Sequence, residues 1–352
     1  MIVFLIVILL LAALMEWLSL RGGAACADGD FSLSKTRAEA DEPVEMTVSA
    51  RNTGRLPITY LALRIAFPPA ADLPDTADAR MERSLRVVTE TFRLWGRSAK
   101  ERTLRFRISA RGVHTLSGRE LARGDFLGLR LISRQLDRRQ VLLVYPRRLE
   151  SPALAEAVGN DCGAMSARRW LLRDPVLTLG VREYTGTEPM RTISWSQTAR
   201  RGELMVREFD YTRTLNCAVL LSVSGLGADE DALLDRCCGA ARTVCETLIA
   251  HGVEARLYTN AALTGYRSEP WRSASASAGR EMDLLDILAR VTSVPCSDPV
   301  VLARAALSGA DALAYLLIVP HADAGAEAAM AALLRGGGAG TRLIAVDALE
   351  VD

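Results

Sequence analysis

Hydrophobic and polar positions follow different periods in successive regions of the chain. Residues 1–21 begin with an apolar run that is first interrupted at Glu16. A helix that crosses a bilayer needs about 20 mainly apolar residues, with roughly 17 as the lower end. The segment reaches that length if Glu16 lies at the membrane interface, where Trp17 is also favoured. The pattern predicts an N-terminal transmembrane anchor over 1–21.

Two alternatives to this anchor stay open. A cleaved signal peptide has positive charge ahead of its apolar run, and none precedes this one. A lipidated segment would use Cys26, which follows small residues, although Gly23 stands where an aliphatic residue is usual. Positive residues follow the apolar run, beginning with Arg21. By the positive-inside rule we expect a single-pass protein of the cell membrane whose body lies in the cytoplasm.

A period of two dominates from Phe31 to about Tyr145. Alternating hydrophobic and polar residues, separated by turn signals, indicate short strands with one buried face. The clearest of these runs are 44–48, 60–65 and 104–108, and a final strand is expected at 141–145, before Pro146. Short strands at regular spacing predict an antiparallel β-sandwich domain over 30–148.

The pattern changes again at Leu215. Residues 217–223 form a continuous apolar run, which is typical of a parallel strand buried on both faces. Strand-like runs then alternate with amphipathic helical segments, which favours a doubly wound α/β domain over 213–352. We expect strands at 253–259, 314–319 and 343–346 and helices at 229–251, 281–291, 300–307 and 324–335. The predicted fold class is α+β multidomain, with 149–212 as a linker and signature segment.

Composition excludes some classes of function. The 352 residues include 43 Lys and Arg against 42 Asp and Glu, and this net charge of +1 gives no electrostatic case for binding nucleic acid. The seven cysteines are an odd number without a Cys-x-x-Cys pair, which favours free or buried thiols. His114, His251 and His321 lie far apart in the sequence, so a histidine-based metal site is not expected.

The most informative stretch lies between the two predicted domains. It contains Gly-x-Arg-Glu-Tyr from Gly180, Arg-x-Ile-x-Trp from Arg191, and Ala-Arg followed by Gly-Glu-Leu from Ala199. This pattern resembles the bacterial family called domain of unknown function 58 (DUF58). The resemblance extends to the runs 112–116, 125–129 and 144–146 and covers most of the chain. The signature residues, which we take as candidate partner-binding residues, are Gly180, Arg182, Glu183, Tyr184, Arg191, Trp195, Ala199, Arg200, Gly202, Glu203, Arg207 and Glu208.

The charges of this stretch allow two interpretations. In the favoured one, arginines and acids form a self-contained ion-pair network around a buried Trp195, because the planar guanidinium pairs bidentately with carboxylates. In the alternative, the arginines form a docking surface for an acidic partner or an anion. The arginines are Arg182, Arg191, Arg200, Arg201 and Arg207, and the acids are Glu183, Glu188, Glu203, Glu208 and Asp210.

The resemblance also implies a C-terminal domain similar to the von Willebrand factor A (vWA) fold. Many such domains hold Mg²⁺ through Asp-x-Ser-x-Ser after the first strand, because this hard cation takes oxygen ligands. Here Ser222, Ser224 and Leu226 stand at those positions, so the carboxylate and one hydroxyl are missing. Asp323 is displaced from the place where a further acid is expected. We therefore expect a degenerate metal site and no cofactor.

Three classes of function are compared. The favoured one is a membrane-anchored, non-catalytic adaptor, because the body shows no recognisable catalytic set. The resemblance implies a MoxR-type AAA+ ATPase as its partner, in the assembly or maturation of other proteins. The alternative is a Mg²⁺-dependent adhesion module of the vWA type. An enzyme is least favoured, because Ser224 lies in Ser-Val-Ser-Gly and not in a Gly-x-Ser-x-Gly elbow.

Overall fold

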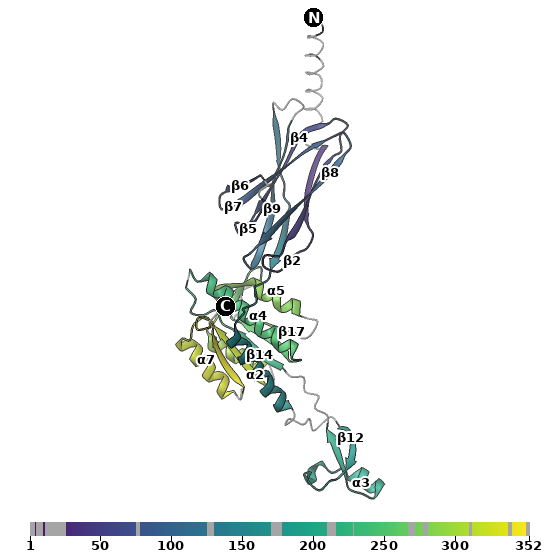
Figure 1. Cartoon of the computed structure of the whole chain (residues 1–352), viewed down its shortest axis with the longest axis vertical. Coiled ribbons are helices and arrows are strands. Elements are labelled where there is room, and N and C mark those ends of the chain that lie inside the picture. Colours follow the sequence, from purple (N-terminus) through teal and green to yellow (C-terminus); the bar gives the residue numbers. More distant parts are fainter. Residues whose placement is uncertain are drawn as a thin grey trace. The chain divides into compact units, whose positions relative to one another are not determined.

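The chain forms two compact units, Met1–Arg147 and Arg148–Asp352, each of which is described by itself (Figure 1). The structure is a computed structural model. It describes residues 4, 10, 26–74, 78–124, 130–169, 178–209, 216–227, 229–266, 272–276, 281–309, 312–336 and 340–349.

The predicted membrane anchor is contradicted, and this part of the fold class is corrected. Among the described residues, no helix is long and apolar enough to cross a membrane. Helix α4 (Asp231–Ala250) reaches 20 residues, but charged side chains are distributed along it, and each is costly in the hydrocarbon of a bilayer. Most of segment 1–21 lies outside the described residues. The single-pass localisation and the cytoplasmic orientation, which depended on the anchor, are withdrawn with it.

Two β-sheets build the first unit. The four-stranded sheet has the order β1-β3-β8-β5, and the seven-stranded sheet has the order β2-β11-β9-β4-β7-β6, with β10 paired to β9. Every pairing is antiparallel except that of β2 with β11. The strands are β1 (Ala27–Leu33), β2 (Arg37–Ala38), β3 (Val44–Asn52), β4 (Ile58–Phe67), β5 (Ala71–Asp72), β6 (Ala79–Glu82), β7 (Leu85–Leu94), β8 (Ala99–Ile108), β9 (Gly112–Gly124), β10 (Leu131–Gln135) and β11 (Arg139–Val144).

The core of this unit lies between the two sheets. Successive side chains of a strand point to opposite faces, and in β3 the apolar Val44, Met46 and Val48 are buried while the polar residues between them are not. Phe67 of β4 and Phe106 of β8 meet edge to face, with ring centroids 5.2 Å apart. This contact joins one sheet to the other, so the alternating pattern produces a sandwich.

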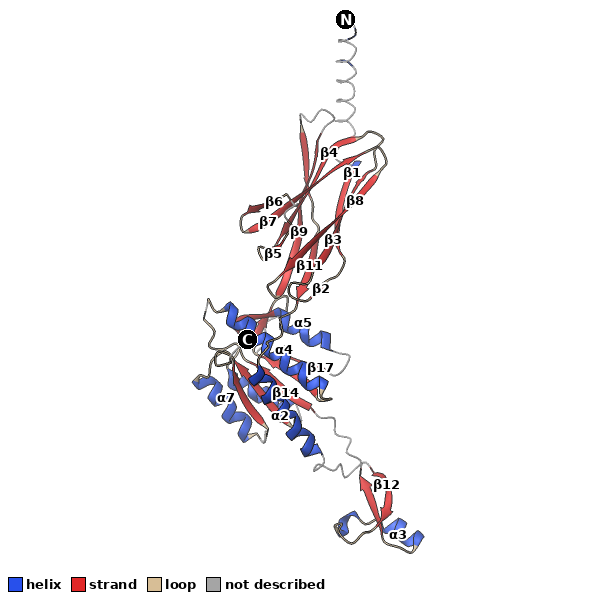
Figure 2. Cartoon of the chain, viewed as in Figure 1, coloured by secondary structure: helices blue, strands red, loops and turns tan. Residues whose placement is uncertain are grey.

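A five-stranded sheet with helices on both faces dominates the second unit (Figure 2). Its order is β17-β15-β14-β19-β20, all parallel except β17. Every residue of β19 is buried, because helices cover both of its faces. Further elements are α2 (Pro152–Arg169), β14 (Asn216–Leu221), β15 (Glu254–Thr259), β16 (Ala261–Leu263), β17 (Arg272–Ala276), α5 (Glu281–Arg290), β18 (Val291–Pro295), α6 (Pro299–Gly309), β19 (Ala314–Val319), α7 (Ala324–Arg335) and β20 (Thr341–Ala345).

The signature segment forms a hairpin with its own small sheet. Strand β12 (Thr178–Glu183) pairs antiparallel with β13 (Met205–Phe209). Between them lie the 3₁₀-helix η2 (Met190–Thr192) and the short helix α3 (Trp195–Arg201). We call residues 178–209 the signature hairpin.

Candidate functional site

The signature hairpin is held by a small buried centre and by backbone hydrogen bonds. Ile193, Met205 and Val206 are buried. The Ser194 N–H donates to Met205 O at 2.8 Å, and the Met205 N–H donates to the Thr198 hydroxyl at 3.0 Å. These bonds tie α3 and the loop before it to β13, so the loop between the strands has a defined conformation.

Gly202 ends α3 and returns the chain toward β13. Its φ of +78° lies in the left-handed region, where a side chain is unfavourable. Its N–H donates to Thr198 O at 2.9 Å and closes the last turn of the helix. The glycine of the signature is therefore explained by the backbone conformation that ends α3.

One ion pair stabilises the loop of the hairpin. Arg182 Nη2 lies 2.6 Å from Glu188 Oε1, and the Thr185 hydroxyl donates to the same oxygen at 2.7 Å. The hydrogen bond from Thr185 and the contact with Arg182 lower the pKa of Glu188 to about 2. This loop is thus held best when Glu188 is ionised.

The predicted ion-pair network around a buried Trp195 is wrong. Trp195 is 62% exposed. Among the side chains that the structure describes, an ion pair within the hairpin is found for Arg182, but none is found for Arg191, Arg200 or Arg207. The reason is geometric: α3 buries none of its residues, and Arg191 on η2 and Arg207 on β13 are also exposed.

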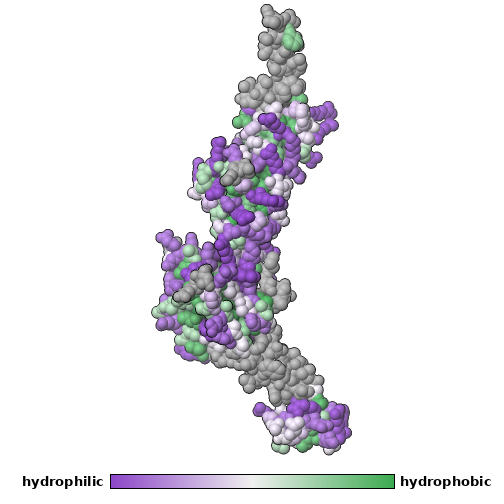
Figure 3. Space-filling view, viewed as in Figure 1, coloured by the Kyte–Doolittle hydropathy of each residue, from purple (hydrophilic) through white to green (hydrophobic). Residues whose placement is uncertain are grey.

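The hairpin instead combines exposed apolar and cationic side chains. Met190 is 72% exposed and Leu204 44%, in addition to Trp195. Exposed arginines flank them along the same loop and helix. Figure 3 shows hydrophobic and hydrophilic residues side by side on this hairpin. We call Met190, Arg191, Trp195, Arg200, Arg201 and Leu204 the exposed signature surface.

The structure places the remaining signature residues around this surface. Gly180, Glu183 and Arg207 lie on the paired strands, and Tyr184 follows β12, where its N–H donates to Leu204 O at 2.8 Å. Ala199 and Glu203 are exposed, on α3 and after it. Glu208 is paired with Gly180 in the register of the hairpin. The twelve residues therefore share one hairpin.

A second polar cluster lies at the carboxyl ends of the parallel strands. The connection after β14 leads to β15 on one side, and the connection after β19 leads to β20 on the other, so β14 and β19 flank the switch point of the sheet. Ligands of open α/β sheets bind at this position. The segment after β14 contains Ser222 and Ser224, and the segment after β19 contains His321 and Asp323.

The side chain of Asn260, directly after β15, occupies the centre of this cluster and is fully buried. Its Nδ2 lies 2.7 Å from Ser297 O, 3.0 Å from Ser224 Oγ and 3.4 Å from Ser222 Oγ. Its Oδ1 accepts the Val223 N–H at 3.0 Å. One amide therefore links three segments that follow three different strands.

Gly225 brings the first of these segments close to Asp323. Its φ is +86°, and a Cβ at this position would lie 3.2 Å from Asp323 Oδ2. Asp323 also caps α7, because its Oδ1 accepts the Ala326 N–H at 2.7 Å. A side chain here would strain the backbone and crowd the Asp323 carboxylate, so glycine suits the position. Leu226, by contrast, packs partly buried against the apolar core.

His321 connects two carboxylates at the same edge. Its Nδ1 lies 2.8 Å from Asp347 Oδ2 and its Nε2 lies 3.5 Å from Glu230 Oε2. The hydrogen bond to Asp347, followed by that to Glu230, raises the pKa of His321. Glu230 in turn accepts the Gly227 N–H, which lowers the pKa of its carboxyl group. The cluster favours protonated histidine.

Sequence reasoning named Ser222, Ser224 and Asp323 but missed Asn260, His321 and Asp347 as members of this cluster. Across the described residues, no group of three or more His, Cys, Asp or Glu side chains is placed to hold a metal ion. Asn260 stands directly after a buried strand, and this position is the only signal that could have identified it. Which residues it contacts depends on strand order.

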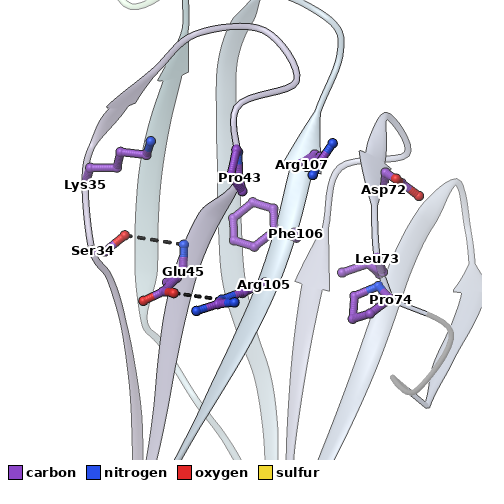
Figure 4. Close-up of a pocket in the computed structure, with 10 residues that line it drawn as sticks. All are labelled: Ser34, Lys35, Pro43, Glu45, Asp72, Leu73, Pro74, Arg105, Phe106 and Arg107. Atoms are coloured by element: carbon purple, nitrogen blue, oxygen red, sulfur yellow. Dashed lines mark hydrogen bonds and ion pairs between the residues drawn. The ribbon is translucent and has the colours of Figure 1, made fainter.

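A hollow of about 770 Å³ on the sandwich unit is a further candidate (Figure 4). Three of its charged side chains pair locally: Arg105 Nε lies 2.8 Å from Glu45 Oε1, and Lys35 pairs with Glu42. Ser34 accepts the Glu45 N–H at 3.3 Å. Because most of its polar groups already have partners, we rank the hollow below the two sites described above.

Comparison with known proteins identifies the signature. The family model described as "Protein of unknown function DUF58" matches residues 180–229, from the hairpin into the segment after β14. The "Uncharacterized protein YeaD" of Bacillus subtilis (strain 168) is 22% identical over 203 residues, which are 57% of this chain and 49% of that protein. The chain thus spans about half the length of this relative. Together the two matches support DUF58 as the family of this chain.

Similar solved structures contribute less. A cohesin module of a family 33 glycoside hydrolase from Clostridium perfringens ATCC13124 has 8% identity and a TM-score of 0.27, and the match covers 34% of this chain and 96% of that one. A type II cohesin domain from the cellulosome of Acetivibrio cellulolyticus has 11% identity and a TM-score of 0.26, covering 33% and 94%. Scores this low carry no argument about fold or function.

Proposed function

We propose that this protein is a non-catalytic adaptor that binds a protein partner through the exposed signature surface. The observation that carries the proposal is the 62% exposure of Trp195 on a hairpin that has its own buried centre. Tryptophan and arginine are the side chains most enriched among energetically dominant interface residues. A large exposed aromatic ring beside several cations is costly to leave in water and favourable to cover.

The partner surface that fits this hairpin is acidic with an apolar pocket. Arg191, Arg200 and Arg201 are exposed, and no ion pair is found for them among the described side chains, so their charges are available to carboxylates of a partner. Such pairs raise the rate of association and select the partner. The DUF58 resemblance suggests a MoxR-type AAA+ ATPase as this partner, in the assembly or maturation of other proteins.

We further propose that the α/β unit is of the vWA type. Support comes from the five-stranded sheet with an antiparallel edge strand β17 and from helices on both faces. In this proposal the α/β unit is the domain that carries the signature hairpin. Binding through the hairpin requires no catalytic group.

The test measures binding of a purified MoxR-type ATPase from the same genome to the full chain. Trp195→Ala is expected to raise the dissociation constant about 30-fold, which corresponds to a loss of about 2 kcal/mol of binding free energy. Trp95→Ala is the matched control, because Trp95 is 75% exposed but lies on the sandwich unit. Equal affinity of wild type and Trp195→Ala would contradict the proposed surface, and absence of binding by the wild type would contradict the proposed partner.

A charge-reversal pair tests the cationic part of the surface. Arg191→Glu with Arg200→Glu is expected to slow association, with a larger effect at low salt, because exposed charges are screened beyond about 10 Å at 0.1 M salt. Arg93→Glu with Arg107→Glu, at exposed positions of β7 and β8, is the control with the same change in net charge. If both pairs slow association equally, the effect belongs to net charge and not to the hairpin.

A further inference from the structure

The vWA resemblance implies a divalent cation at the carboxyl end of β14, and the residues present do not fit one. Mg²⁺ needs oxygen lone pairs directed at it, with carboxylates among them. Ser222 and Ser224 instead direct their hydroxyl oxygens at the amide nitrogen of Asn260, at 3.4 and 3.0 Å. Asp323 Oδ1 is used to cap α7.

The orientation of the Asn260 amide is determined by its partners. Ser297 O is a carbonyl and can only accept, so the group 2.7 Å from it must be the NH₂. The Val223 N–H can only donate, so the group 3.0 Å from it must be the amide oxygen. If the amide were flipped, its oxygen would face the Ser297 carbonyl oxygen and its NH₂ would face the Val223 N–H, and neither contact is a hydrogen bond. A hydrogen-bond donor therefore lies between the two serine hydroxyls.

We infer that the NH₂ group of Asn260 takes the place of a cation at this edge of the sheet. The partial positive charge of its two N–H bonds is shared among two hydroxyl oxygens and one carbonyl oxygen. The three segments are thereby fixed without a divalent ion. This inference rests on the proposed vWA type of the α/β unit, but it does not depend on the adaptor function or on the signature hairpin.

The inference makes Asn260→Asp an informative substitution, because the two side chains have nearly the same shape. The introduced carboxylate would place an oxygen 2.7 Å from Ser297 O, in a position with no exposure to solvent. Oxygens that face each other at this distance repel, and a buried unpaired charge is costly. A divalent cation between them would remove the repulsion, with the two serine hydroxyls as further ligands.

The experiment compares thermal unfolding of the full chain in the wild type, Asn260→Asp and Asn260→Ala, with and without millimolar Mn²⁺ or Mg²⁺. Without metal, Asn260→Asp is expected to lower the midpoint by about 10 °C. Metal is expected to restore at least half of that loss in Asn260→Asp and to change the wild type and Asn260→Ala by less than about 1 °C. This pattern would support the inference.

Two results would overturn it. The first is a wild-type midpoint that rises with metal in a manner lost in Ser224→Ala, because a cation would then already bind beside the amide. The second is an Asn260→Asp chain that responds to metal no more than Asn260→Ala. If Asn260→Asp does not fold, refolding in Mn²⁺ decides: recovery of folded protein supports the inference, whereas failure under conditions where Asn260→Ala refolds contradicts it.

Discussion

The signature hairpin and the junction around Asn260 use polar and apolar side chains in opposite ways. At the junction, a fully buried amide satisfies hydroxyl, carbonyl and N–H groups within 3.4 Å. On the hairpin, the aromatic ring of Trp195 is exposed and the arginines beside it project into solvent. The family match over residues 180–229 includes the hairpin and the serine segment after β14, whereas Asn260 and Ser297 lie outside it.

This difference teaches where a binding site should be sought. Hydroxyls at the switch point of an α/β sheet normally suggest a ligand, but here they are consumed by an internal amide. On the exposed signature surface, by contrast, the apolar side chains are exposed, and no ion pair is found for the arginines among the described side chains. Unsatisfied groups, and not polar groups as such, identify the surface that a partner would cover.

The largest expected effect separates the two regions by stability. Asn260→Ala should destabilise the α/β unit by about 3 kcal/mol, because it removes the acceptor of the buried Val223 N–H and the donor to the half-buried Ser297 carbonyl. Urea denaturation followed by circular dichroism measures this change. Exposed Arg200→Ala serves as the control and should change stability by less than about 0.5 kcal/mol. A loss below about 1 kcal/mol for Asn260→Ala would mean that water replaces the amide.

A second comparison lies within the hairpin. Met205 is 1% exposed, so Met205→Ala should destabilise the hairpin by about 2 kcal/mol through lost packing. Amide hydrogen exchange at Tyr184 and Ser194 is then expected to accelerate about 30-fold, because a destabilisation of that size raises the population of the open hairpin by the same factor. Trp195→Ala should change the same rates less than about twofold. Similar acceleration by both variants would show that the Trp195 side chain stabilises the hairpin and is not only an exposed surface group.

The smallest expected effect is a pH dependence of opposite sign in the two regions. The pKa of His321 is raised above 6.5, so its stabilising contribution is full below pH 6.5 and is lost as pH rises through the folded value. The pKa of Glu188 is lowered from 4.5 to about 2, so its contribution is full above pH 4.5 and is lost as pH falls through about 2.

The measurement follows each region by its own probe. The free energy of unfolding of the α/β unit, measured with urea, should fall by less than about 1 kcal/mol between pH 6 and pH 9. The effect is small because His321 and its partners are all more than one third exposed. His321→Gln should flatten this dependence. On the hairpin, an NMR titration should give a carboxyl midpoint near pH 2 for Glu188, and Thr185→Val should raise it.

Several elements of the fold were predictable from local periodicity. The strand expected at 314–319 is β19 (Ala314–Val319), and the helix expected at 324–335 is α7 (Ala324–Arg335). The strand expected at 141–145 is β11 (Arg139–Val144), displaced by about two residues at its start. A continuous apolar run or a strict alternation reports which faces of an element are buried. The DUF58 signature was likewise visible in the sequence and is supported by the family match.

The sequence by itself determined the burial pattern of these strands and helices and the identity of the signature, but it did not determine what those residues contact. Asn260 meets Ser222 and Ser297 because β15, β14 and the segment before α6 are brought to one edge by strand order, across separations of 38 and 37 residues. Trp195 is exposed because α3 is tied to β13 by its backbone and by Thr198, and not by its aromatic ring. Periodicity is a local property, whereas these contacts depend on long-range topology, so only the tertiary structure decided which polar groups were satisfied and which remained available.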